Sequence, residues 1–391
     1  MKGPARRQGT GVMRFAEDGS YSFSVFDGFE DIRETWAGLS VAAVPAPLTS
    51  VTLLEGWWET VGRARHEAMR IVLVADATGP LAVFPFVLGR YHTVRYVEWM
   101  GAAGQPGRGP LVAADVLAGL TPERALALLD GAAAALDEPV DAMLLRDMPA
   151  ELGGFANPFL GPEAVAAGTG HRRHHLRAAD RRPALAGADL RVGTDRLAAF
   201  GPLVFETAQS VQERAYLAAI LVDQLAAASA VDPVEEDRLA CLHHLAMTDP
   251  ADTIDGAGTV IGGLFAGDRA VAVVLVATHG DYAATLAVSG SGAADLAGIA
   301  SARLAAAHAR DWFADAGFAV LDTPLSAAPE TETESGAVVV PHAHLFRQKT
   351  TLGYLLCAGE RTLARVKASY HEPATGEAAG RMENKRKSAA A

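Results

Sequence analysis

The pattern of hydrophobic and polar positions predicts a chain in which strands alternate with amphipathic helices. Short runs with alternating apolar residues are typical of strands, and apolar residues three or four positions apart are typical of helices. In the first 160 residues, strands are predicted at 21–26, 70–75, 81–88, 94–100 and 141–146. Helices are predicted at 29–39, 49–65 and 121–136, the last beginning at Pro122. This part reads as a mixed α/β unit around an antiparallel meander.

The same order of elements returns further along the chain. Residues 161–200 are polar, and helices are predicted at about 195–227 and 233–247. The elements that follow are strands at 259–265, 270–277 and 282–288, a helix at 293–316, a strand at 318–322 and another candidate strand at 352–357. Both halves therefore share one order of elements: a hairpin, a third strand, a glycine-rich break, a helix and a strand. This shared order indicates a duplicated unit. The predicted fold class is therefore α/β (α+β), with tandem lobes that each contain a mixed, mostly antiparallel sheet flanked by helices.

Length and composition set the domain organisation. The chain has 391 residues, half of them hydrophobic, which fits two domains. We expect a flexible leader at 1–19, lobes at 20–160 and 161–371, and a disordered tail at 372–391. The leader has no apolar segment of a secretory signal, and no run approaches the roughly 20 apolar residues of a membrane helix. We therefore expect a cytoplasmic protein.

The charge and the cysteines argue against several kinds of function and of site. The formal net charge is −12, which argues against broad nucleic-acid binding. Two distant cysteines, Cys241 and Cys357, form neither a disulfide framework nor a zinc site. The run His171–His175 holds three histidines and two arginines with no carboxylate spaced for a metal, and it reads as an exposed basic segment that contacts anions or only solvent.

The segment after the predicted strand at 282–288 is the strongest candidate for a cofactor site. Glycines allow the backbone to approach a ligand closely, and the free N–H groups at a helix N-terminus bind anions. The loop lacks the third glycine of a dinucleotide-binding fingerprint and the Gly-Lys-Ser/Thr of a P-loop. An ordinary glycine-serine turn without a ligand is the alternative. The residues of the candidate site are Val288, Ser289, Gly290, Ser291, Gly292, Ala293 and Ala294.

At this point the chain resembles the CelD/BioF-like acetyltransferases, which are GNAT-superfamily relatives close to the FemABX transferases. The stretch 176–192 (LRAADRRPALAGADLRV) is similar to that family's arginine-rich entry, 260–288 to its core hairpin and 289–317 to its CoA-loop helix. The helix that carries Trp57 and Trp58 resembles the N-terminal lobe, although both tryptophans also suit a core. The resemblance covers most of residues 20–325.

The resemblance implies an acyl-CoA-dependent N-acyltransferase that uses acetyl-CoA or another acyl-CoA. The acceptor is a small-molecule amine, with an amino sugar of polysaccharide or envelope biosynthesis as one option. The sequence departs from the GNAT signature at Ala287, where Gln or Arg is expected, and the family's Tyr-Lys pair has its nearest counterpart in 346–349.

Three residues are candidates for proton transfer. A general base has to lie within reach of the amine. Glu206, on the predicted helix, and Asp281 or Tyr282, beside the core strand, fit this role, and Tyr282 also suits protonation of the leaving thiolate. The alternatives are a solvated helix face for Glu206, a turn position for Asp281 and a core aromatic for Tyr282.

Two other functions compete with this one. A catalytically silent GNAT-like module that binds a partner is favoured by Ala287. A FemABX-like transferase that uses aminoacyl-tRNA requires a basic surface or an inserted coiled-coil arm, and neither is visible in the sequence.

Overall fold

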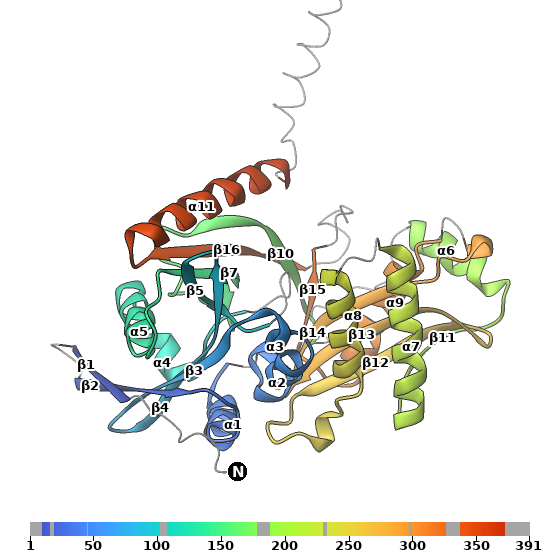
Figure 1. Cartoon of the computed structure of the whole chain (residues 1–391). Coiled ribbons are helices and arrows are strands. Elements are labelled where there is room, and N and C mark those ends of the chain that lie inside the picture. Colours follow the sequence, from blue (N-terminus) through green and yellow to red (C-terminus); the bar gives the residue numbers. More distant parts are fainter. Residues whose placement is uncertain are drawn as a thin grey trace, which may run out of the picture.

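The computed structural model describes residues 10–15, 19–44, 46–101, 108–177, 188–229, 233–296, 299–325 and 337–371. A 14-stranded sheet runs through the whole molecule (Figure 1). Its strand order is β1-β2-β3-β4-β5-β7-β16-β10-β15-β14-β13-β12-β11, with β6 paired to β4. The central strands bring together residues far apart in the chain, so side chains from both predicted lobes meet there.

The strand order is symmetric about the contact between β16 and β10. On one side lie β2 (Gly19–Phe26), β3 (Ala68–Asp76), β4 (Gly79–Tyr91), β5 (Val94–Trp99), β7 (Ala142–Pro149) and β16 (Val338–Gln348). On the other side lie, from the edge inwards, β11 (Leu203–Thr207), β12 (Gly258–Ala266), β13 (Arg269–His279), β14 (Tyr282–Gly290), β15 (Val320–Pro324) and β10 (Val165–His175). We call the first set the first lobe and the second set the second lobe.

Each lobe contains the same pairing pattern. Within a lobe the neighbours are antiparallel except for one parallel pair, β5 with β7 and β14 with β15. The predicted fold class and the repeated order of elements are therefore confirmed. The innermost strand of the first lobe comes last in the chain: β16 follows all the strands of the second lobe but pairs with β7. The domain boundary at 160 stays a prediction.

Helices cover both faces of the sheet. The first lobe carries α1 (Arg33–Ala42), α2 (Val51–Trp57) with the turns η2 (Trp58–Gly62) and α3 (Arg63–Arg65), α4 (Ala114–Gly119), α5 (Pro122–Ala134) and α11 (Thr351–His371). The second carries α6 (Ala188–Ala198), α7 (Val211–Ala228), α8 (Pro233–Ala246) and α9 (Ser301–Asp315). Local sequence explains several starts: Thr121 caps α5 before Pro122, and Ser210 and Glu213 form a capping box on α7.

The remaining elements are short and lie near the junction of the lobes or at the edge of the sheet. They are β1 (Thr10–Phe15), η1 (Pro47–Thr49), β6 (Leu111–Val112), β8 (Glu151–Leu152), β9 (Phe155–Ala156), η4 (Pro250–Asp252) and η5 (Ala294–Leu296).

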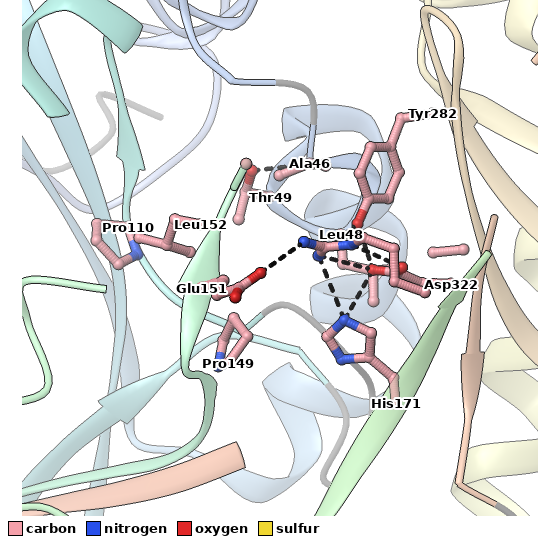
Figure 2. Close-up of a pocket in the computed structure, with 13 residues that line it drawn as sticks. Ala46, Leu48, Thr49, Pro110, Pro149, Glu151, Leu152, His171, Tyr282 and Asp322 are labelled. Carbon is pink, nitrogen blue, oxygen red and sulfur yellow. Dashed lines mark hydrogen bonds and ion pairs between the residues drawn. The ribbon is translucent and has the colours of Figure 1, made fainter. Parts of the chain in front are cut away.

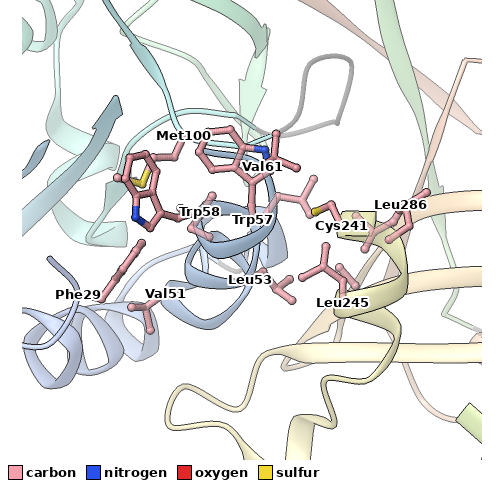
Figure 3. Close-up of a cluster of buried hydrophobic side chains, with 14 of the residues drawn as sticks. Phe29, Val51, Leu53, Trp57, Trp58, Val61, Met100, Cys241, Leu245 and Leu286 are labelled. Atoms are coloured by element: carbon pink, nitrogen blue, oxygen red, sulfur yellow. The ribbon is translucent and has the colours of Figure 1, made fainter. Parts of the chain in front are cut away.

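A single apolar cluster joins the lobes. Trp57 and Trp58 are 4% and 7% exposed and pack in the same cluster as Cys241 and Leu245 of α8 (Figure 3). Burying several large side chains in this way stabilises the arrangement, at about 1.5–3 kcal/mol for each fully buried side chain. The lobes are therefore packed together beneath the junction, and the two tryptophans are core residues.

The structure corrects four predicted elements. The helix at 195–227 is instead α6, strand β11 and α7, because Gly201, with φ +136°, and Pro202 end the helix before an alternating stretch. Glu206 therefore lies on a strand. The strand at 352–357 is the start of α11, in which Gly353, Cys357 and Ala364 recur at helical spacing on the buried side.

The other two corrections concern the helix that follows the candidate cofactor loop and the run of histidines at 171–175. The helix at 293–316 begins later, as η5 and then α9 from Ser301. The run His171–His175 belongs to β10, where His171, Arg172, Arg173 and His174 are at most 8% exposed, so it is not an exposed segment. Residues 1–9, 16–18 and 372–391, most of 176–192 and the acidic loop at 330–334 lie outside the described residues.

Candidate functional site

A small pocket lies where the two lobes meet (Figure 2). Its volume of about 50 Å³ is enough for a few water molecules. The first lobe contributes Ala46, Leu48 and Thr49 around η1 together with Pro110, Pro149, Glu151, Leu152 and Gly153. The second lobe contributes His171, Arg173, Tyr282, Ala284 and Asp322. One wall is thus mostly apolar and the other is polar.

Strand register explains why the polar residues converge. Arg173 of β10 is the register partner of Asp322 of β15, which is in turn the partner of Ala284 of β14. Side chains two residues apart on a strand share a face, so His171 lies on the same face as Arg173, and Tyr282 on the same face as Ala284. Neighbouring strands therefore present four polar side chains to one space.

Asp322 is the centre of the hydrogen-bond network. Its carboxylate accepts from the phenol of Tyr282, from Nε of Arg173 at 3.1 Å and from Nη2 of Arg173 at 3.2 Å. Nε2 of His171 lies 2.9 Å from Oδ2. Burial acts to raise the pKa of Asp322, but the hydrogen bonds and charges of His171 and Arg173 outweigh it and hold the pKa below its ordinary value. The carboxylate is therefore ionised at neutral pH.

Tyr282 stays protonated in this environment. Burial, followed by the negative charge of Asp322, raises the pKa of its phenol well above the ordinary value. The phenol oxygen also accepts from Nη2 of Arg173 at 2.9 Å. Tyr282 is thus placed as a hydrogen-bond or proton donor whose oxygen is stabilised by a cation, and this environment does not suit it as a base.

A pair of buried histidines extends the network inwards. Nδ1 of His171 lies 2.8 Å from Nε2 of His342, a residue of β16, and the two side chains are 1% and 3% exposed. Burial, followed by the charge of His171, lowers the pKa of His342 to about 4. If Nε2 of His171 donates to Asp322, Nδ1 accepts from His342, and Nδ1 of His342 then has no hydrogen-bond partner in the described part of the chain. Such a buried unpaired atom is uncommon in folded proteins.

Glu151 lies at the mouth of the pocket. Its side chain is 44% exposed, and Oε2 lies 3.4 Å from Nη1 of Arg173. It sits on the short hairpin of β8 and β9, whose turn includes Gly153. A Cβ at Gly153 would lie 1.7 Å from Cγ1 of Val44, and φ is +55°, so glycine lets the hairpin pack beside η1. Glu151 therefore combines contact with the network and contact with solvent.

Of the three predicted proton-transfer residues, only Tyr282 lines this pocket. Asp281 is in the turn before β14, where its 54% exposed side chain lies 3.8 Å from Arg177. Glu206 is an exposed residue of the edge strand β11. Roles for Asp281 and Glu206 stay predictions.

The predicted cofactor loop follows β14. Within it, Ser289 is 2% exposed and donates to Gln224 Oε1 at 2.7 Å, while Ser291 N–H donates to Val271 O at 2.8 Å. A Cβ at Gly290 would lie 2.7 Å from Oγ of Ser301, the first residue of α9, whereas a Cβ at Gly292 would meet nothing within 4 Å. Gly290 thus allows the end of β14 to pack against the N-terminus of α9, and Gly292 faces open space.

The strands beside the loop separate. β14 pairs with β15 only from Tyr282–Val320 to Ala284–Asp322, although it pairs with β13 as far as Gly290. Leu286 is an extra residue in β14, because Thr285 and Ala287 oppose the consecutive residues Val276 and Leu275. In the described part of the chain, the side of β14 that faces β15 therefore has no strand partner after Ala284. Ala287, at the position where Gln or Arg was expected, is buried in the core that joins the lobes.

Sequence reasoning missed Asp322, His342 and Glu151, and it read His171 and Arg173 as part of an exposed basic segment. Asp322 follows the apolar stretch Phe318–Leu321 directly, and a carboxylate at the end of a buried strand is the one signal that the sequence offered. The candidate counterpart of the Tyr-Lys pair lies elsewhere: Arg347 and Lys349 pair with Asp130 of α5 at 2.8 and 2.6 Å.

The described residues contain no group of three or more His, Cys, Asp or Glu side chains placed to hold a metal ion. No helix among the described elements is long and apolar enough to cross a membrane.

The architecture is a tandem of two lobes, each built on a mixed, mostly antiparallel sheet flanked by helices. No protein-family model matches the sequence, and no curated protein does. Among solved structures, FemX superposes with a TM-score of 0.51 at 12% sequence identity, over 83% of this chain and 97% of FemX. At that identity the likeness shows a common fold and nothing about activity.

Two other solved structures superpose less closely. A tandem GNAT protein from the clavulanic acid biosynthesis pathway gives a TM-score of 0.44 at 12% identity, over 84% of this chain and 98% of that one. A conserved protein of unknown function from Bacteroides thetaiotaomicron gives 0.48 at 10% identity, over 83% and 99%.

Proposed function

We propose that this protein transfers an acyl group from an acyl-CoA thioester to an amine at the pocket between the lobes. The observation that supports this most is the separation of β14 from β15 next to the Tyr282–Asp322–Arg173 network. In the described part of the chain, backbone groups of β14 beyond Ala284 have no strand partner on that side, and an extended amide-containing chain can bind there as an added strand does. Pantetheine has this chemistry, and its thioester end would point towards the pocket.

The loop after β14 would bind the phosphate end of the same ligand. The packing of Gly290 against Ser301 brings the end of the strand to the N-terminus of α9, and such a terminus favours phosphate groups. Val288, Ser289, Gly290, Ser291, Gly292, Ala293 and Ala294 are thus the proposed cofactor-binding residues.

Two different residues of the pocket would then carry out the two proton transfers of the reaction. The amine attacks the thioester carbonyl, forming a C–N bond, and the C–S bond breaks to release the thiolate. Glu151, in contact with solvent, accepts the proton lost by the amine, and Tyr282 donates a proton to the thiolate. Arg173 stabilises the phenolate that forms until the proton returns from Glu151 through water. Positioning and proton transfer of this kind account for large parts of such rate enhancements.

The acceptor that this site favours is a small amine, which binds as the ammonium ion and loses one proton to water before the neutral amine attacks. Two carboxylates, Asp322 and Glu151, face the pocket, and its volume excludes a bulky substrate in the present conformation. An amino sugar requires the η1 or β8–β9 segments to move outwards.

One alternative has its own support. Ser291 N–H and Ala293 N–H are already engaged, by Val271 O and by Ser291 Oγ. Together with Ala287, these features favour a GNAT-like module that binds a partner and does not catalyse acyl transfer.

Calorimetric titration separates the two functions. Acetyl-CoA and octanoyl-CoA are titrated into the wild-type protein and into Gly292→Asp and Gly292→Ala. Both variants fit the open space at Gly292, but only Asp opposes a phosphate, so we expect at least tenfold weaker binding for Asp alone. Absence of binding by the wild type at millimolar ligand would exclude the acyl-CoA function and favour the silent module.

A further inference from the structure

The outward side of α11 carries a row of apolar residues. The helix packs across β10, β16, β7 and β5 through the buried residues Gly353, Cys357 and Ala364, and it lies at the surface of the molecule (Figure 1). On the opposite side, Leu352, Leu355, Leu363 and Val366 are 50%, 65%, 49% and 46% exposed. The solvent side of a surface helix is normally polar, so this row indicates a surface that another molecule covers.

The row is symmetric about Gly359. Leu352 and Leu355 lie seven and four positions before it, and Leu363 and Val366 lie four and seven positions after it. All five residues fall on one side of a helix with 3.6 residues per turn. A pattern that reads the same in both directions is complementary to itself when a second helix runs antiparallel.

Gly359 itself points to an external contact. A Cβ at Gly353 would lie 1.8 Å from Asp141 O, so the chain's own packing requires that glycine. A Cβ at Gly359 would meet nothing within 4 Å. A glycine inside a helix destabilises the helix relative to alanine, and a close crossing with another helix offsets that loss.

A groove beside the row has the matching shape. It has a volume of about 540 Å³ and lies between the first half of α11 and the β4–β5 turn, with Leu352, Leu355 and Gly359 on one side and Tyr91 and Val94 on the other. The second half of the row carries the exposed side chains of Leu363 and Val366. An antiparallel crossing at Gly359 places these two side chains over the groove of the other copy, and the symmetry repeats the contact.

We propose that two copies of this chain form a dimer through antiparallel α11 helices that cross at Gly359. Leu352 of one copy then packs against Val366 of the other, and Leu355 against Leu363. The interface is isologous and leaves the pocket between the lobes uncovered. The dimer does not depend on the proposed activity.

Sedimentation equilibrium of the full chain, without ligand, tests the association. We expect a dimer at micromolar concentration and a dissociation constant at least tenfold higher for Leu355→Glu. Val41→Glu is the control, because Val41 is an 85% exposed residue of α1, away from α11. Circular dichroism confirms that both variants are folded. A wild-type monomer at all concentrations, or a dimer that Leu355→Glu leaves unchanged, overturns the proposal.

A disulfide test fixes the geometry. The two-fold axis places residue 359 beside its own copy, so oxidised Gly359→Cys is expected to form a covalent dimer. Tyr354→Cys, on the same helix but outside the row, is expected to stay monomeric on a denaturing gel. The native Cys241 and Cys357 are buried and serve as the wild-type background. A dimer in which Gly359→Cys fails to cross-link overturns the crossing at Gly359.

Discussion

The two lobes share a strand pattern but differ at the position that matters most for chemistry. The parallel pair Tyr96–Ala142 of the first lobe corresponds to Ala284–Asp322 of the second, and Val94 corresponds to Tyr282 through the matching hairpins. The second lobe therefore places a buried carboxylate and a phenol where the first has Ala142 and Val94. Ala142 is fully buried in an apolar cluster beneath α11.

Because of this difference, the second lobe carries the polar groups of the pocket and the first lobe carries apolar residues at the equivalent positions. In the first lobe, α11 covers the equivalent face of the sheet and the cluster beneath it is apolar. In the second lobe, the corresponding face is covered by η1 and the β8–β9 hairpin of the first lobe, which leave a pocket. A duplicated unit has thus kept one polar site, and the other copy supplies a wall of that site.

The largest change in the free energy of unfolding is expected when the carboxylate that distinguishes the lobes is removed. Asp322→Ala leaves Arg173 and His171 buried without their acceptor, and we expect a loss of about 3–5 kcal/mol in the free energy of unfolding. Asp295→Asn, which removes an exposed ion pair with Arg269, is the control, and it is expected to leave the free energy of unfolding almost unchanged. Urea denaturation measures both. Equal losses in the two variants would contradict a special role for the buried carboxylate.

The histidine pair predicts a dependence of stability on pH. The pKa of His342 is about 4 in the folded protein and about 6.5 when unfolded, so between these values the unfolded chain binds the additional proton. Stability is therefore lost as the pH falls from about 6.5 to 4, by roughly 3 kcal/mol from His342. His342→Gln is expected to reduce the slope of this part of the curve, while His174, whose pKa burial also lowers to about 4, still contributes to it. The exposed His243→Gln is expected to leave the slope unchanged. An unaltered slope in His342→Gln would contradict the assignment.

A smaller effect is expected from the phenol. Tyr282→Phe removes one hydrogen-bond donor to Asp322, which costs about 1–2 kcal/mol of stability. If the protein transfers acyl groups, release of thiol from the bound acyl-CoA is expected to fall about 10²–10⁴-fold. Tyr96→Phe, the same chemical change on β5 of the first lobe, is the control, and it is expected to leave thiol release unchanged. A similar fall in both variants would indicate a general structural effect.

The smallest change in stability is expected at the mouth of the pocket. Glu151→Gln affects a side chain that is 44% exposed, so the free energy of unfolding is expected to change by less than about 1 kcal/mol. Acyl transfer to a small amine is nevertheless expected to fall, because the proton acceptor is lost. Normal transfer by a folded Glu151→Gln would remove this residue from the mechanism.

The sequence predicted the meanders of both lobes because their strands have strong apolar patterns. It did not predict β10 and β16, in which arginine and histidine occupy buried positions and depend on partners from other strands. Register brings Arg173 opposite Asp322 and places His342 two residues beyond Val340, the partner of His171. No local pattern reports register between segments more than 140 residues apart. Tyr282 was found because it begins a predicted strand, whereas its partners depend on tertiary pairing.

The position of β16 has a consequence for synthesis of the chain. β16 and α11 complete the first lobe, but they are encoded after the whole second lobe. While the polypeptide emerges from the ribosome, β7 therefore exposes an unpaired edge, and the apolar residues around Ala142 have no cover. The N-terminal half must wait for residues 338–371 before it can close. Fragments that stop before this segment are expected to aggregate, and separate expression of the two halves requires this C-terminal segment to be joined to the first.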